Sequence, residues 1–146
     1  MSERTVFQSI PKRHVLSLSP QDSVWDAACA MTRANCGSVL VMEPPDRLLG
    51  IVTERDLMTR VLPRALDPKA TPLLQVMTPH PVCVPPEMKV SDAVLILIER
   101  GFRHLPIVAP DRKILGVFSV RDALPREVGA ALSQAESHEQ VNDALG

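Results

Sequence analysis

Aromatic side chains are scarce in this sequence. Its 146 residues include one tryptophan, three phenylalanines and no tyrosine, which together make up 3% of the chain. Proteins that bind single-stranded nucleic acid stack bases on such rings. The 16 basic residues are balanced by 17 acidic ones, so no excess of positive charge attracts a polyanion. No direct contact with nucleic acid is therefore expected.

Cysteines and long apolar runs are also few. Cys29, Cys36 and Cys83 are too few for a disulfide framework and form no C-x-x-C pair. The longest obvious apolar run, residues 93–98, is far shorter than the roughly 18 residues of a membrane-spanning helix. The first nine residues lack the apolar centre of a signal peptide. These features predict a soluble, cytoplasmic protein that does not associate with membranes.

Signatures of catalysis and of metal binding are lacking as well. The sequence contains neither a G-x-S-x-G motif nor a glycine-rich phosphate loop. His80, Cys83 and His104 do not have the paired spacing of a metal site. We expect no enzymatic activity, no metal and no covalent cofactor.

What the sequence does contain is an internal repeat. Displacing the chain by 66 positions (86 − 20) places Pro20 on Pro86, and the two copies then align without a gap. The matched identical residues are Pro20, Val24, Asp26, Ala27, Pro44, Leu49, Gly50, Arg55 and Asp56 with Pro86, Val90, Asp92, Ala93, Pro110, Leu115, Gly116, Arg121 and Asp122.

Both copies show the same periodicity of apolar residues. Alternation predicts a short first strand, and spacing of i, i+3, i+4 and i+7 then predicts a helix. Two further strands and a second helix, which begins at Thr53 or at Ser119, complete a β-α-β-β-α unit of the α/β (α+β) class. The predicted helix faces are Val24, Ala27, Ala28 and Met31 in the first copy and Val90, Ala93, Val94 and Leu97 in the second.

The repeat also predicts the division of the chain. The first copy spans residues 8–62, a proline-rich connector spans 63–75, and the second copy spans 76–125. A unit of about 60 residues has a marginal core, so the two copies are expected to pair. Residues 126–146 form a polar tail of helical composition, in which we expect fraying.

One helix is too apolar for a single buried face. Residues 94–98 are apolar all the way round, and Trp25 and Cys29 widen the apolar face of the equivalent helix in the first copy. Such helices need burial on more than one side. This pattern favours a homodimer interface over the alternative, burial within one chain.

The most informative local motif occurs once in each copy, as residues 50–56 and 116–122. Each reads Gly, two apolar residues, a hydroxyl residue, any residue, Arg and Asp. A hydroxyl residue at a helix start favours an anion such as phosphate, and the Asp can accept hydrogen bonds from paired ribose hydroxyls. The alternative is a capping box within each helix, with Asp in place of Glu or Gln.

The repeat, these two motifs, residues 76–79 (Val-Met-Thr-Pro) and residues 103–106 (Arg-His-Leu-Pro) together resemble a CBS domain pair. The family takes its name from cystathionine β-synthase, and the chain resembles its small stand-alone bacterial members. The resemblance covers about residues 8–125. It implies a pseudo-two-fold pair of repeats, a homodimer of such pairs, and adenosine-containing ligands such as AMP, ATP, NAD(H) or S-adenosylmethionine in clefts between the repeats.

The resemblance also assigns residues to the ligand. It implies that the carboxylates hold the ribose, that the hydroxyls approach ribose or phosphate, that a basic pair contacts phosphate, and that residues 78–82 contact adenine. The residues concerned are Asp56 and Asp122, Thr53 and Ser119, Arg103 and His104, and Thr78 and Val82. The first copy departs from this pattern, because Gly37-Ser38 replaces the basic pair.

These observations lead to a functional hypothesis. The protein is expected to be a regulatory module that senses a nucleotide and signals to a separate, unidentified protein. The alternative is a structural dimerisation or interaction module with empty clefts, in which Thr53, Asp56, Ser119 and Asp122 only cap helices.

Overall fold

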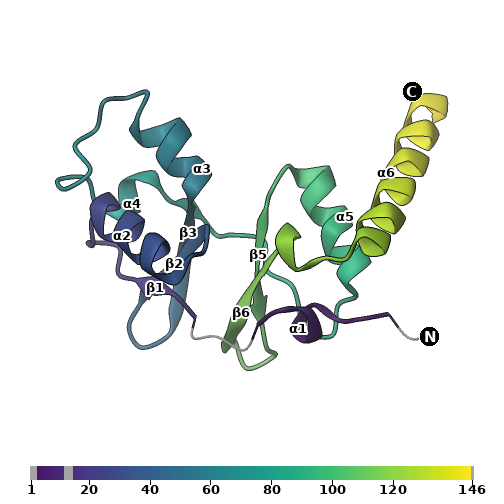
Figure 1. Ribbon diagram of the computed structural model, residues 1–146, viewed down its shortest axis with the longest axis horizontal. Helices are drawn as coiled ribbons and strands as arrows, with labels where there is room; N and C mark the ends of the chain where they lie inside the picture. The colour runs from purple at the N-terminus through teal and green to yellow at the C-terminus, as the bar shows by residue number, and fades with distance from the viewer. Residues whose placement is uncertain (1–2, 12–14, 146) are drawn as a thin grey trace. The chain divides into compact units, whose positions relative to one another are not determined.

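The computed structural model describes residues 3–11 and 15–145 of the chain. The described residues divide into two compact units (Figure 1). The central unit is Val15–Pro81. The terminal unit combines the described residues before His14 with those from Val82 onward.

The central unit is built on a sheet of four strands in the order β1-β2-β3-β4. Strand β1 lies parallel to β2, and the other neighbours are antiparallel. The strands are β1 (Ser17–Leu18), β2 (Ser38–Glu43), β3 (Arg47–Thr53) and β4 (Thr78–Pro79). The helices are α2 (Val24–Ala34), α3 (Glu54–Asp56), the π-helix η1 (Leu57–Val61) and α4 (Leu73–Val76).

The terminal unit repeats this plan with a smaller sheet. Strands β5 (His104–Val108) and β6 (Ile114–Ser119) are antiparallel, and Val84 forms an isolated parallel bridge to Ile107. That bridge takes the place of β1. The helices are α1 (Val6–Ser9), α5 (Val90–Arg100), the 3-10 helix η2 (Val120–Asp122) and α6 (Pro125–Leu145). The predicted order β-α-β-β-α is therefore found in both copies, although in the second copy the first strand is reduced to a single bridge and the second helix to η2.

Local sequence explains where α2 and α5 begin and end. Ser23 and Asp26 form a capping box at the start of α2, so two backbone N–H groups that lack helical partners are satisfied. Asn35 is the C-terminal cap of α2 and Gly101 that of α5, both in the left-handed conformation that terminates helices. The bounds of both helices thus follow from signals within a few residues.

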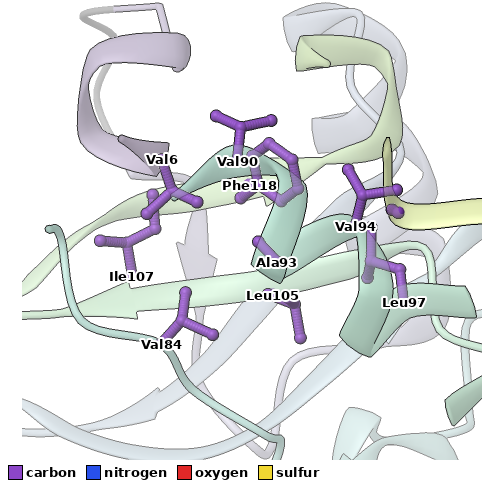
Figure 2. Close-up of a cluster of buried hydrophobic side chains, with 10 residues drawn as sticks. Val6, Val84, Val90, Ala93, Val94, Leu97, Leu105, Ile107 and Phe118 are labelled. Carbon is purple, nitrogen blue, oxygen red and sulfur yellow. The ribbon is translucent and has the colours of Figure 1, made fainter. Parts of the chain in front are cut away.

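The predicted apolar faces form the two cores. In the terminal unit, Val90, Ala93, Val94 and Leu97 of α5 are at most 4% exposed and surround Phe118 and Leu105 with Val6, Val84 and Ile107 (Figure 2). In the central unit, Val24, Ala27 and Met31 of α2 pack with residues of β2, β3 and α4, whereas the predicted fourth member, Ala28, is only partly buried. Each unit therefore has a core of its own.

The short helices α1 and α4 are interchanged between the copies. Helix α1 overlaps the start of the first copy in sequence but belongs to the terminal unit, where Val6 N–H donates to Met88 O and Val90 N–H donates to Arg4 O. Helix α4 precedes the second copy but belongs to the central unit, where Leu73 N–H donates to Asp22 O. Val6 and Leu73 are completely buried there. The compact units therefore do not coincide with the sequence repeats.

The second helices of the two copies differ. After Thr53 the chain is helical through α3 and η1, whereas after Ser119 it makes only the three-residue η2. Ala123 is extended, and α6 begins at Pro125. The second helix predicted from Ser119 therefore begins there but is only a 3-10 turn, and α6 follows it as a separate helix. Proline disfavours helical geometry in the residue before it and is tolerated in the first helical turn.

Helix α6 packs against α5 within the terminal unit (Figure 1). Ala131 is completely buried and joins the core. Further along, His138 Nδ1 lies 2.7 Å from Glu99 Oε1. Part of the apolar surface of α5 is thus covered within its own chain, while Ile98 remains 38% exposed.

Candidate functional site

The first motif lies where β3 passes into α3. Gly50 lies beside the segment that forms β4: a Cβ atom there would be 2.6 Å from Met77 Sδ and 2.7 Å from Thr78 O. A contact below 3 Å with a backbone atom leaves no room for a side chain. Glycine is therefore required at this position for β4 to lie close to β3.

Thr53 and Asp56 form a complete capping box. Asp56 Oδ2 accepts hydrogen bonds from Thr53 N (2.8 Å) and from Thr53 Oγ1 (3.1 Å), and Asp56 N donates to Thr53 Oγ1 (3.3 Å). Asp56 is only 8% exposed. The two oxygens of this carboxylate have different partners, because Oδ1 lies 3.5 Å from Arg60 Nε.

The second motif has the same arrangement in a tighter helix. Ser119 N donates to Asp122 Oδ2 over 2.9 Å, and Arg121 N donates to Ser119 Oγ over 3.2 Å. A capping box is present here too. The capping interpretation of both motifs is therefore satisfied by the geometry, while each carboxylate retains lone pairs that can accept further hydrogen bonds.

The predicted basic pair lies beside the second motif. His104 is opposite Ser119 in the β5–β6 register, and Val120 N donates to Arg103 O over 3.4 Å. Arg103 is exposed, whereas the Nδ1 atom of His104 is buried. The structure therefore brings Arg103, His104, Ser119 and Asp122 together at one end of a single sheet.

The central unit has neutral residues at the equivalent place. Ser38 is opposite Thr53 in the β2–β3 register, and Glu54 N donates to Gly37 O over 3.0 Å. The backbone hydrogen bonding and strand register are thus the same in both units, while the basic side chains at this place occur only in the terminal unit. Of the two sheet ends, only that of the terminal unit has an Arg-His pair at this position.

The residues predicted to contact adenine fall in different units. Thr78 is opposite Ile51 in the β3–β4 register, and His80 N–H donates to Leu49 O over 3.1 Å, so Thr78 lies on the same sheet as Thr53. Val82 begins the second part of the terminal unit and packs against its core. Thr78 therefore belongs with the first motif, and Val82 with the unit of the second.

Two arginines next to the motifs were missed by sequence analysis. Arg60 Nη1 donates to Val76 O and Met77 O, both over 3.2 Å. Arg4 Nη2 donates to Asp122 O over 3.0 Å and to Glu127 Oε1 over 2.8 Å. The i, i+4 spacing of Asp56 and Arg60 was a visible signal, whereas 118 residues separate Arg4 from Asp122.

Charge–charge contact shifts two pKa values at the second motif. Hydrogen bonding to Arg4 lowers the pKa of Glu127 below its ordinary value, and the same contact raises the pKa of Arg4. Both groups are therefore held in their charged forms. In the segment before α5, burial raises the pKa of the Cys83 thiol.

The described part of the chain has neither a metal-binding cluster nor a membrane-spanning helix. Among residues 3–11 and 15–145, no group of three or more His, Cys, Asp or Glu side chains is arranged to hold a metal ion. No helix in these ranges has the length and apolar character needed to cross a membrane. The three cysteines, all within these ranges, form no disulfide.

Comparison with known proteins identifies the family. The family model of the CBS domain matches residues 7–63 and 73–128. The chain therefore belongs to the CBS domain family, and its two matched segments make it a CBS domain pair. The resemblance inferred from the repeat and its motifs is confirmed, as is the fold class.

Two relatives match most of this chain. An uncharacterized 17.7 kDa protein of Acidianus ambivalens is 34% identical over 118 residues, which are 81% of this chain and 70% of that protein. An uncharacterized protein of Methanopyrus kandleri is 30% identical over 118 residues, again 81% of this chain but 60% of its own length.

A solved structure shares the fold. The CBS domain protein of Pyrobaculum aerophilum, whose solved structure is a complex with AMP, matches this chain with a TM-score of 0.77. It is 20% identical, and the match covers 92% of this chain and 99% of that one. At this identity the likeness concerns the fold alone.

Proposed function

We propose that this protein is a regulatory module that binds an adenosine-containing nucleotide of the AMP, ATP, NAD(H) or S-adenosylmethionine class and signals to a separate protein. The observation that carries the proposal is the duplicated Ser/Thr–Asp arrangement at the end of a strand in both units. The complex of the Pyrobaculum aerophilum protein with AMP supports the ligand class. The role is regulatory and not catalytic.

Each motif has a defined part in this proposal. The carboxylates of Asp56 and Asp122 accept hydrogen bonds from ribose hydroxyls, because their Oδ2 atoms are fixed by backbone N–H groups. Thr53 and Ser119 lie beside them and approach ribose or phosphate. Thr78 and Val82 lie in the segment that approaches adenine.

The two units are proposed to differ in their preference for phosphate. Arg103 places a permanent cation and His104 an imidazole at the sheet end beside Ser119, whereas Ser38 is neutral beside Thr53. A nucleotide with more phosphate charge therefore favours the terminal unit. The central unit favours a ligand recognised through its nucleoside part.

The proposal includes a homodimer of CBS pairs in the cytoplasm. Exposed apolar side chains on both units provide surface for self-association; they include Trp25, Met58, Leu62 and Leu74 in the central unit and Phe102, Leu124 and Leu132 in the terminal unit. The absence of disulfides among three cysteines favours a reducing compartment.

Native mass spectrometry with nucleotide titration tests this function. The gently purified protein would be measured alone and with AMP, ATP, NADH and S-adenosylmethionine. A dimer that saturably binds one of them supports the sensor. The double variant Asp56→Ala with Asp122→Ala is the matched control, and it should lose the bound nucleotide.

One observation favours a second candidate function. Both Asp carboxylates already complete capping boxes, as a purely structural dimerisation module would require. A dimer that binds none of the four compounds would support this alternative.

A further inference from the structure

The guanidinium of Arg60 joins the two parts of the central unit that the proposed function assigns to ribose and to adenine. Its Nε lies 3.5 Å from Asp56 Oδ1. Its Nη1 donates to the carbonyl oxygens of Val76 and Met77, the two residues that precede Thr78. One planar group therefore spans the motif carboxylate and the start of β4.

The carbonyls that Arg60 engages lie at the end of α4. Carbonyl groups in the last turn of a helix lack partners within that helix, and α4 ends at Val76 with Met77 as its C-terminal cap. Arg60 thus fixes the point from which the chain enters β4. From there Met77 packs against Gly50, and Thr78 pairs with Ile51.

In the terminal unit, a different arginine joins the interchanged N-terminal segment to the second motif. There Arg4, which lies in the interchanged N-terminal segment, donates to Asp122 O and to the Glu127 carboxylate. The counterpart of Arg60 in the repeat, Arg126 (60 + 66), is exposed. In both units, then, one arginine links the interchanged segment to the motif. In the central unit this arginine follows the motif in the chain, whereas in the terminal unit it belongs to the interchanged segment.

We infer that Arg60 is a positioning residue of the central unit: it orients the Asp56 carboxylate and holds β4 at a fixed separation from it, and so sets the selectivity of this unit for a ribose that carries both hydroxyls. This inference rests on the proposed function. Lysine could not replace arginine here, because a single ammonium group lacks the planar fork that reaches both partners.

The link to β4 is tested without any ligand. Hydrogen exchange of the His80 amide, which donates to Leu49 O, would be measured in the full chain and in Arg60→Gln and Arg60→Lys. Loss of two side-chain hydrogen bonds is expected to speed this exchange about fivefold or more. Arg64→Gln, an exposed position four residues along the chain, is the control and should leave the rate unchanged. An unchanged rate in Arg60→Gln would overturn the link.

Selectivity is tested in an Asp122→Ala background, which leaves the central unit to bind nucleotide. The affinities for AMP and 2′-deoxy-AMP would be compared by calorimetry with and without Arg60→Gln. We expect the ratio of the affinity for AMP to that for 2′-deoxy-AMP to fall about tenfold in Arg60→Gln, the effect of losing one hydrogen bond to a charged group. An equal loss of both affinities would show a structural role only and would overturn the inference.

The proposed function and the positioning role of Arg60 are refuted by different results. If the unaltered chain binds no AMP, the proposed function and the selectivity role fall together, while the amide exchange rates still show whether Arg60 holds β4. If AMP binds and the preference is unchanged in Arg60→Gln, the proposed function stands and the positioning role is refuted.

Discussion

The guanidinium of Arg4 and the carboxylate of Glu127 form two hydrogen bonds, Nε to Oε2 over 3.2 Å and Nη2 to Oε1 over 2.8 Å, across 123 residues of sequence. The side chain of Glu127 is 8% exposed and that of Arg4 is 31% exposed. Glu127 Oε1 also accepts from Leu124 N over 2.7 Å. This pair therefore fixes the start of α6 to the N-terminal segment beside Asp122.

Removing either partner should destabilise the protein. Arg4→Ala leaves a nearly buried carboxylate without its charged donor, and hydrogen bonds to charged groups contribute about 1.5–3 kcal/mol each before solvent exposure reduces the figure. We expect the free energy of unfolding to fall by about 1–3 kcal/mol, measured by urea denaturation. Arg64→Ala, at an exposed position of the central unit, is the control with an expected change below about 0.5 kcal/mol.

Acid should weaken the same contact. The pKa of Glu127 in the folded chain lies below its ordinary value of 4.5, so the unfolded state binds the proton more readily and stability falls with decreasing pH. The contribution of this contact to the free energy of unfolding is complete above pH 4.5. It is lost as the pH falls through the lowered pKa of Glu127 in the folded chain. Glu127→Gln should flatten this part of the stability profile in urea titrations between pH 6 and about pH 3. An identical acid dependence in the variant would refute the assignment.

The motif carboxylates should matter more for ligand than for folding. Asp56→Ala and Asp122→Ala each remove a cap, which costs about 0.5–2 kcal/mol, and each should weaken nucleotide binding about 10- to 100-fold in its own unit. Calorimetry measures the affinity and thermal unfolding checks the fold. Unchanged affinity in both variants would contradict the ribose assignment.

The basic pair should determine how strongly nucleotide affinity depends on phosphate charge. Arg103→Gln with His104→Gln removes both basic side chains beside Ser119 while leaving Asp122 in place. We expect the affinity for ATP to fall about tenfold or more and that for adenosine to change little, since only the charged ligand loses a partner. Equal changes for both ligands would show that the pair does not contact phosphate.

Two glycines at equivalent positions should differ in their tolerance of a side chain. In Gly50→Ala the new Cβ meets the backbone oxygen of Thr78 at 2.7 Å, whereas in Gly116→Ala it meets only the terminal carbon of Ile10 at 2.5 Å. A flexible side-chain end can move, while the paired strand β4 cannot move without losing hydrogen bonds. We expect losses of about 1–3 kcal/mol for Gly50→Ala and less for Gly116→Ala, measured by thermal unfolding.

Much of this architecture was readable from local patterns. The spacing of Val90, Ala93, Val94 and Leu97 predicted one buried helix face, because a 3.6-residue period brings these positions together whatever the helix packs against. The capping boxes at Thr53 and Ser119 were also weighed from spacing. Periodicity and capping depend only on residues within one or two helical turns, so both can be predicted from the sequence alone.

The additional helix in the tail was only half predicted. Residues 126–146 had the composition of a helix, and α6 covers Pro125–Leu145. The burial of Ala131 and Glu127 was not foreseen, since most of the helix extends beyond the repeat and its partners lie far away in the chain. Burial of this kind depends on which surface is left uncovered elsewhere.

The sequence by itself determined the repeat, the order of strands and helices in each copy, the two Ser/Thr–Asp motifs and the family. Only the tertiary structure decided that α1 and α4 are interchanged, that Arg4 and Arg60 lie beside the motifs, and that Thr78 lies in one unit and Val82 in the other. The physical reason is range: hydrogen bonds and apolar contacts between distant segments are selected by the packing of the whole unit, and no local pattern records them.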